Sequence, residues 1–85
     1  MIIVDVQIGK TYRHFKGNYY RVLLIASDSE TPIGEKVREM VVYESLYGNH
    51  RIWVRPIDLF VSKVDKDLYP DADQEYRFQL VEDYD

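Results

Sequence analysis

The sequence predicts a mostly β fold, a small SH3-like domain built as a strongly bent sheet or barrel of five or six antiparallel strands with one short 3₁₀ turn. Three observations favour this class. Short runs rich in Val, Ile and Tyr recur along the chain, and Gly, Asn, Asp and Pro separate them. No apolar spacing of helical period is long enough for more than a single turn. The 85 residues suit a single domain spanning 1–85.

The first predicted elements are an N-terminal strand extension over 1–8 and a hairpin. Apolar and polar residues alternate in the extension. In the hairpin, two β-rich runs flank Gly17 and Asn18, a pair typical of a two-residue turn. This register pairs Phe15 with Tyr20 and His14 with Arg21. It predicts a core face made of Phe15, Tyr20, Val22 and Leu24. The opposite face is then made of Tyr12, His14, Tyr19 and Arg21.

A second hairpin is predicted after a mobile loop over 27–37, which is rich in Ser, Asp, Pro and Gly. Its strands are 38–46 and 52–55, and Pro56 ends the second strand. A three-residue loop at 48–50 pairs Leu46 with Ile52, whereas a two-residue loop would place Trp53 with Val42 and Leu46. The first register is preferred because it separates an apolar face from a polar, aromatic one. The faces are Val42, Leu46, Ile52 and Val54, and Tyr43, Ser45, Tyr47, Trp53 and Arg55.

The C-terminal part predicts a cap, two more strand-like segments and an acidic loop. Residues 56–60 suit one helical or 3₁₀ turn, with Pro56 first and two apolar residues closing a barrel end. Residues 61–64 resume the strand pattern. Residues 65–75 are acidic, contain Pro70 and read as a loop, and 76–81 predict the last strand. Residues 82–85 are expected to fray.

Two long motifs carry a family resemblance. They are Tyr-Arg-His-Phe-Lys-Gly-Asn-Tyr-Tyr-Arg-Val-Leu at 12–23 and Val-Val-Tyr-Glu-Ser-Leu-Tyr-Gly at 41–48, followed by Trp-Val-Arg-Pro at 53–56. They resemble domain-of-unknown-function family 1653, a small family of bacteria and phages. The resemblance covers about residues 8–64, so 9–64 is taken as the family core. Residues 76–78 show a weaker similarity to the family. Asp28 stands where that family often has histidine, and the family name implies no activity.

Charge and composition argue against several classes of protein. Residues 1–62 carry eight Lys/Arg and seven Asp/Glu, whereas residues 63–85 carry three and eight. A near-neutral body with an acidic C-terminal segment makes binding to long nucleic acid unlikely, because such binding usually needs a basic stripe. There is no cysteine, no apolar run long enough to span a membrane and no basic leader before the apolar start. A cytoplasmic location without membrane contact is expected.

No motif for catalysis, metal or cofactor binding is recognisable. His14 and His50 are the only histidines, too few for a zinc site without carboxylates at unhelpful spacing. The serines sit in no nucleophile elbow, and there is no phosphate-binding glycine loop. The chain is therefore expected to be no enzyme and to use no metal or cofactor.

The constellation that predicts binding combines aromatic rings with arginines. Flat rings stack on bases, and arginine grips phosphate or carboxylate through two parallel hydrogen bonds. The same rings are also ordinary β-sheet residues, and capping of the core by them is the competing interpretation. The candidate ligand-binding residues are His14, Tyr19, Arg21, Tyr43, Tyr47, Trp53 and Arg55.

Three functions follow from this face. The first is a non-enzymatic module that binds or sequesters a small nucleotide-like or other anionic ligand. The second is an SH3-like module for protein–protein interaction, since such domains take extended peptides in Tyr and Trp grooves. The third is a nucleic-acid-associated accessory domain. The apolar N-terminal strand would expose an edge unless paired, so a homodimer is also expected.

Overall fold

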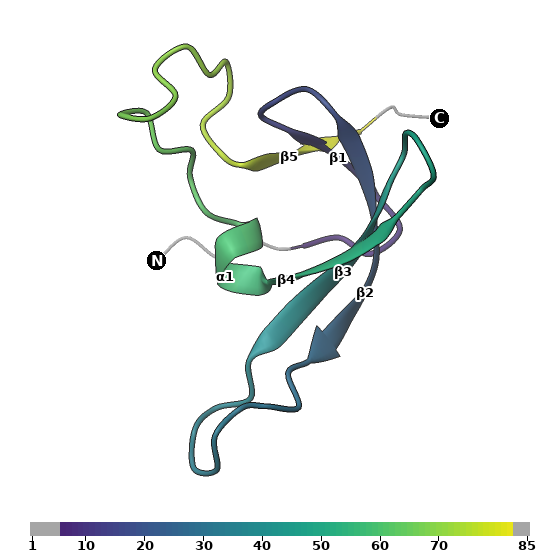
Figure 1. Cartoon of the computed structure of the whole chain (residues 1–85), viewed down its shortest axis with the longest axis vertical. Helices are drawn as coiled ribbons and strands as arrows, with labels where there is room; N and C mark the ends of the chain where they lie inside the picture. The colour runs from purple at the N-terminus through teal and green to yellow at the C-terminus, as the bar shows by residue number, and fades with distance from the viewer. Residues whose placement is uncertain (1–5, 83–85) are drawn as a thin grey trace.

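One open antiparallel sheet dominates the computed structural model, which describes residues 6–82 (Figure 1). Its strands are β1 (Thr11–His14), β2 (Tyr19–Ser27), β3 (Glu39–Ser45), β4 (Ile52–Pro56) and β5 (Phe78–Val81), in the order β4-β3-β2-β1-β5. One short helix, α1 (Ile57–Phe60), follows β4 directly. The mostly β prediction is confirmed, with five strands in the described part of the chain.

The sheet does not close, so the barrel alternative is not confirmed. The strands β4 and β5 lie at opposite edges and do not pair. Pro56 lacks an N–H for further pairing, and the chain turns into α1 at this point. In α1 the Val61 N–H donates to the Ile57 carbonyl at 3.0 Å, an α-helical bond four residues back, so of the predicted helical or 3₁₀ turn the structure has the helical form.

Two predicted strands differ in the structure. The N-terminal strand over 1–8 falls partly on residues 1–5, which lie outside the described residues, and residues 6–8 form no strand. Residues 61–64 form no ladder either, but Lys63 makes a single antiparallel bridge with Tyr76. This bridge holds together the two ends of the loop over 65–75.

The predicted register of the first hairpin is wrong by three residues. Tyr12 pairs with Tyr20, and the His14 N–H donates to the Asn18 carbonyl at 2.8 Å. The loop is therefore Phe15-Lys16-Gly17, and Gly17 adopts φ +112°, which suits the last position of a three-residue turn. An odd shift moves every side chain of one strand to the opposite face. Tyr12 and His14 consequently share the inner face of the sheet with Tyr20 and Val22.

The second hairpin has the predicted faces but not the predicted register. Tyr43 pairs with Trp53 and Val42 with Val54, two residues away from the prediction. An even shift keeps each side chain on its face. Tyr43, Ser45, Trp53 and Arg55 accordingly share the inner face, while Val42, Ile52 and Val54 lie on the outer face.

A β-bulge in β2 explains why Leu24 is not in the core. Val22 pairs with Tyr43 and Leu24 with Val42, so Leu23 is the extra residue on β2. The bulge turns Leu24 to the outer face, where it is 48% exposed, and it bends the strand. In Figure 1 the β2–β3 hairpin projects away from β1, β5 and α1, with its 28–38 loop at the far end.

The core lies on the inner face, between the sheet and α1. Phe60 of α1 packs edge-on against Tyr12 and Tyr43 and stacks on Phe78, with ring centroids 4.1 Å apart for the stacked pair. The buried cluster is completed by Val22 and Val41. Rings from α1, β1, β3 and β5 therefore converge where the sheet itself is open.

Candidate functional site

A pocket of about 290 Å³ opens on the inner face, beside the aromatic core. Ligand pockets usually measure roughly 300–1,000 Å³, so this volume suits one small ring system. Its lining comes from all five strands and the loop between β3 and β4. The lining residues are His14, Tyr20, Tyr43, Tyr47, Trp53, Arg55 and Phe78.

Strand pairing brings these residues together. Tyr43 of β3 pairs with Trp53 of β4. Two residues further along each strand, the buried Val41 pairs with Arg55. Tyr20 enters from β2, where it pairs with Ser45. His14 and Phe78 are paired across β1 and β5, at the other side of the pocket. Because the sheet curves, residues from its two edges meet above the middle strands.

Aromatic edges and faces form the walls. The ring of Tyr20 stands edge-on to those of Tyr43, Tyr47 and Phe78, with centroids 5.5–5.7 Å apart. His14 also packs edge-on against Phe78, at 5.0 Å. These T-shaped contacts are the arrangement that ring quadrupoles favour, so the walls hold a defined shape.

Two hydrogen bonds fix the rim. The indole N–H of Trp53 donates to Ser45 Oγ at 2.8 Å, and the hydroxyls of Tyr20 and Tyr47 lie 3.0 Å apart. Burial and the bond to the Tyr47 hydroxyl raise the pKa of Tyr20 above its ordinary value, so it stays a neutral phenol. Trp53 remains 44% exposed, and the Arg51 guanidinium lies 5.7 Å from its ring centroid.

Arg55 gives the pocket a positive charge. Its guanidinium lies 5.9 Å from the Phe78 ring centroid, a cation–π distance. The ion pairs within residues 6–82 join other residues, and Arg55 takes part in none of them. Its hydrogen-bond donors are therefore available to an anion that enters the pocket.

His14 is a neutral member of the site. Burial, then the charges of Arg77, Arg55, Lys16 and Arg13, lower the pKa of His14 to about 4. Its Nδ1 accepts the Lys16 backbone N–H at 3.1 Å, which leaves the proton of the neutral ring on Nε2. At neutral pH His14 can thus donate one hydrogen bond to a ligand without adding charge.

The structure brings together five of the seven predicted site residues. Those five are His14, Tyr43, Tyr47, Trp53 and Arg55. Tyr19 and Arg21 lie on the outer face, because the first hairpin has a three-residue loop. Tyr20 and Phe78 were missed. A three-residue turn in the first hairpin, which was not among the predictions from the sequence, would have found Tyr20, whereas Phe78 depends on β5 pairing with β1, more than sixty residues away in sequence.

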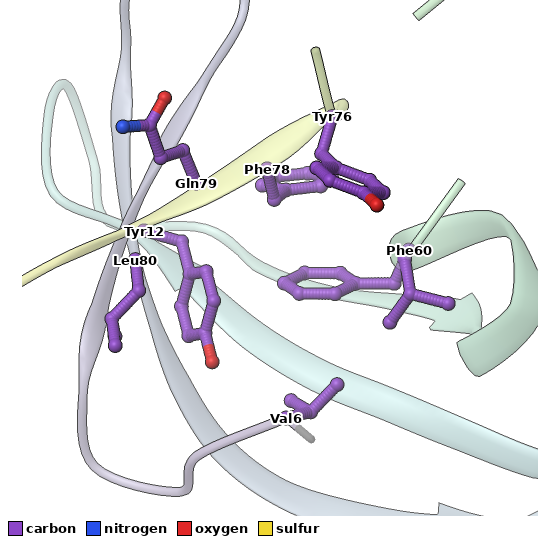
Figure 2. A pocket seen from close by; sticks show the side chains of 8 residues that line it. Val6, Tyr12, Phe60, Tyr76, Phe78, Gln79 and Leu80 are labelled. Atoms are coloured by element: carbon purple, nitrogen blue, oxygen red, sulfur yellow. The ribbon is translucent and has the colours of Figure 1, made fainter. Parts of the chain in front are cut away.

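A second, smaller pocket of about 200 Å³ lies on the other side of Phe78 (Figure 2). Figure 2 shows Phe60, Phe78, Tyr12 and Leu80 around it, with Val6 below. The Tyr12 hydroxyl accepts the Gln7 backbone N–H at 2.9 Å. Its walls carry no charged side chain, so this pocket offers apolar packing and little to orient a polar ligand.

Residues 6–82 hold no cluster of three or more His, Cys, Asp or Glu side chains that could bind a metal ion. In the same part of the chain, no helix is long and apolar enough to cross a membrane.

The comparisons with known proteins point to one family. No curated protein and no solved structure matches the chain. The model of the family described as "Protein of unknown function (DUF1653)" matches residues 10–80. The match extends beyond residue 64, where the resemblance in the sequence motifs ends, and takes in the 65–75 loop and most of β5. Since it covers most of the 85 residues, the chain belongs to the DUF1653 family.

Proposed function

We propose that this chain is a cytoplasmic, non-enzymatic domain that binds, and by binding sequesters, a small nucleotide-like or other anionic ligand in the inner-face pocket. The observation that carries the proposal is the pairing of an accessible Trp53 with an Arg55 that has no acidic partner in the described chain. A planar ring stacked on such residues gains about 1–3 kcal/mol. The guanidinium supplies a charge-assisted, bidentate contact for phosphate or carboxylate.

The lining also favours binding over catalysis. Apart from tyrosine hydroxyls, the pocket contains no carboxylate, serine or lysine that could act as a nucleophile. His14 is its one candidate acid or base, and a pKa of about 4 lies far from the neutral range where proton transfer by histidine is effective.

Trp53 provides a direct experiment, because it is the single tryptophan of the chain. The purified protein is titrated with nucleosides, nucleoside monophosphates and cyclic dinucleotides while Trp53 fluorescence and the melting temperature are followed. The proposal predicts quenching and a higher Tm with at least one anionic member. Unchanged fluorescence and an unchanged Tm with the whole panel would reject it.

Arg55→Gln and Arg21→Gln form a matched pair of variants. Both remove one arginine, but Arg21 lies on the outer face, opposite the pocket. We expect Arg55→Gln to weaken binding of the anionic ligand by about tenfold or more, and Arg21→Gln to leave it unchanged. Equal effects would mean that net charge, and not the pocket, determines binding.

A protein-interaction function is the second candidate, and one observation favours it. β4 is an edge of the sheet, and its Trp53 and Arg55 side chains flank the pocket, so an extended peptide could add a strand beside β4. In that case backbone pairing would dominate. Arg55→Gln would then have little effect, while Val54→Pro, which removes an N–H from β4, would abolish binding.

A further inference from the structure

A third pocket adjoins the inner-face pocket and shares two residues with it. The shared residues are His14 and Arg55, and the third pocket has a volume of about 370 Å³. The first hairpin loop, the 65–75 loop and the segment before β5 form its other walls. Its full lining is His14, Phe15, Lys16, Arg55, Val64, Asp65, Leu68, Tyr69 and Arg77.

The charge of this pocket is opposite to that of the whole chain. Lys16, Arg55 and Arg77 face a single carboxylate, Asp65, although the chain carries a net charge of −4. One oxygen of Asp65 already accepts the backbone N–H groups of Asp67 and Leu68. None of the three cations forms an ion pair with another residue between 6 and 82.

Neighbouring groups hold these cations in place. The Lys16 ammonium lies 5.3 Å from the Tyr69 ring centroid and 5.8 Å from that of Phe15, within cation–π range of both. The Nε of Arg77 donates to Ser62 Oγ at 3.2 Å, while its terminal nitrogens bond to no other described residue. Lysine and arginine donors are thus positioned without being neutralised.

The effect on His14 provides an independent sign of a positive field. Burial is the largest cause of its lowered pKa, and every other cause is a cation: Arg77, Arg55, Lys16 and Arg13. No carboxylate offsets them. An anion between these groups would be attracted at the point where the two pockets meet.

We propose that the two pockets form one bipartite site for a nucleoside phosphate, with the base among Tyr20, Tyr47 and Trp53 and the phosphate between Lys16 and Arg77. The inference rests on the proposed function and deepens it by naming the ligand class and the group in each pocket. Arg55 and His14, which line both pockets, lie between the two groups. Each pocket alone lies near the lower end of the volume range that is usual for ligand pockets, whereas the two together lie well inside that range.

The test separates the base from the phosphate. Trp53 fluorescence titrations compare adenosine and guanosine with their 5′-monophosphates and 5′-diphosphates. The proteins are wild type, Lys16→Glu and Lys36→Glu. Lys36 is an exposed lysine in the distant 28–38 loop, so its variant makes the same charge change away from the pockets. We expect phosphate to raise wild-type affinity by about tenfold or more, and only Lys16→Glu to remove that gain.

The outcomes distinguish the two proposals. If a nucleoside and its phosphates bind equally, or if both lysine variants lose the same amount, the bipartite site is wrong while the aromatic pocket stands. If no compound of this set and the earlier panel changes Trp53 fluorescence or Tm, the proposed function fails. In that case pyrophosphate tests whether the third pocket binds an anion by itself. It should raise the Tm of wild type and of Lys36→Glu but not that of Lys16→Glu. An absence of any such rise would overturn the anion site as well.

Discussion

Gln74 shows how much of this fold depends on a single polar side chain. It is 6% exposed, although it belongs to the acidic 65–75 loop. Its amide accepts a hydrogen bond from the Arg13 guanidinium and donates to the carbonyls of Arg13 and Tyr76. These bonds tie the loop to β1 and so position the wall of the third pocket. Composition predicts the loop as exposed, and no pattern marks one glutamine in it as buried.

Gln74→Ala should lower the free energy of unfolding by about 1–3 kcal/mol, because it leaves the partly buried carbonyls of Arg13 and Tyr76 without this donor. Urea unfolding measures this loss. Gln79→Ala is the control, since Gln79 is exposed on β5 and makes no side-chain hydrogen bond to another described residue. Similar losses in the two variants would show that the Gln74 bonds do not anchor the loop.

His14 makes stability depend on pH in a defined window. Burial and the nearby cations lower its pKa from 6.5 in the unfolded chain to about 4 in the fold. Between these values the unfolded chain binds more protons, so stability falls as the pH drops from 6.5 towards 4. Solvent reaches part of the ring and screens it, which limits the expected loss to roughly 1–2 kcal/mol.

The measurement compares urea unfolding of wild type and His14→Gln across this range. Carboxylates titrate in both proteins, so the difference between the two curves isolates His14. Wild type should lose more stability than the variant on acidification, and parallel curves would contradict the lowered pKa.

At the scale of elements, turn length decided which predictions succeeded. The strands of both hairpins are predictable from β-rich runs between turn residues. The first register fails because Gly17 ends a three-residue loop instead of starting a two-residue one, and this odd shift exchanges Tyr19 and Tyr20 between faces. The second hairpin also slips, but by two residues, so Trp53 and Arg55 stay on the predicted face. Sequence alone carries little information on loop length, because glycine suits both turns.

Gly17→Ala should destabilise the first hairpin by about 1–2 kcal/mol. At φ +112° an L-residue is strained, although the new methyl group would meet nothing closer than Arg13 Nη2 at 4.0 Å. The loss is therefore a backbone effect, and it can be read from the urea midpoint. Asn18→Ala serves as the control, since Asn18 lies outside the left-handed region. A loss no larger for Gly17→Ala than for Asn18→Ala would argue against the three-residue turn.

At the scale of the whole molecule, aromatic side chains connect what the sheet leaves open. A closed barrel would join β4 to β5 by hydrogen bonds, but here Arg55 of β4 lies over Phe78 of β5, and Phe60 of α1 stacks on the same ring. The sequence predicts the aromatic face and its arginine. It does not predict Phe78 or the 65–75 wall of the site, because both depend on contacts between distant segments. The competing interpretation, that the candidate rings cap the core, fits Tyr43, which is buried in the aromatic cluster, whereas Trp53 is 44% exposed.

Phe60 is the residue on which this closure most depends, since it is 2% exposed and contacts rings from β1, β3 and β5. Phe60→Ala should lower the free energy of unfolding by about 3–5 kcal/mol, a large part of the stability of a domain of this size. Phe60→Leu should lose less and stay folded, but with a looser Phe78 and weaker ligand binding. Leu59→Ala, at the exposed neighbouring position of α1, is the control and should unfold close to wild type. Thermal unfolding followed by circular dichroism ranks the variants. If Phe60→Ala melted at the same temperature as Leu59→Ala, the aromatic stack could not be what holds the open sheet around its candidate site.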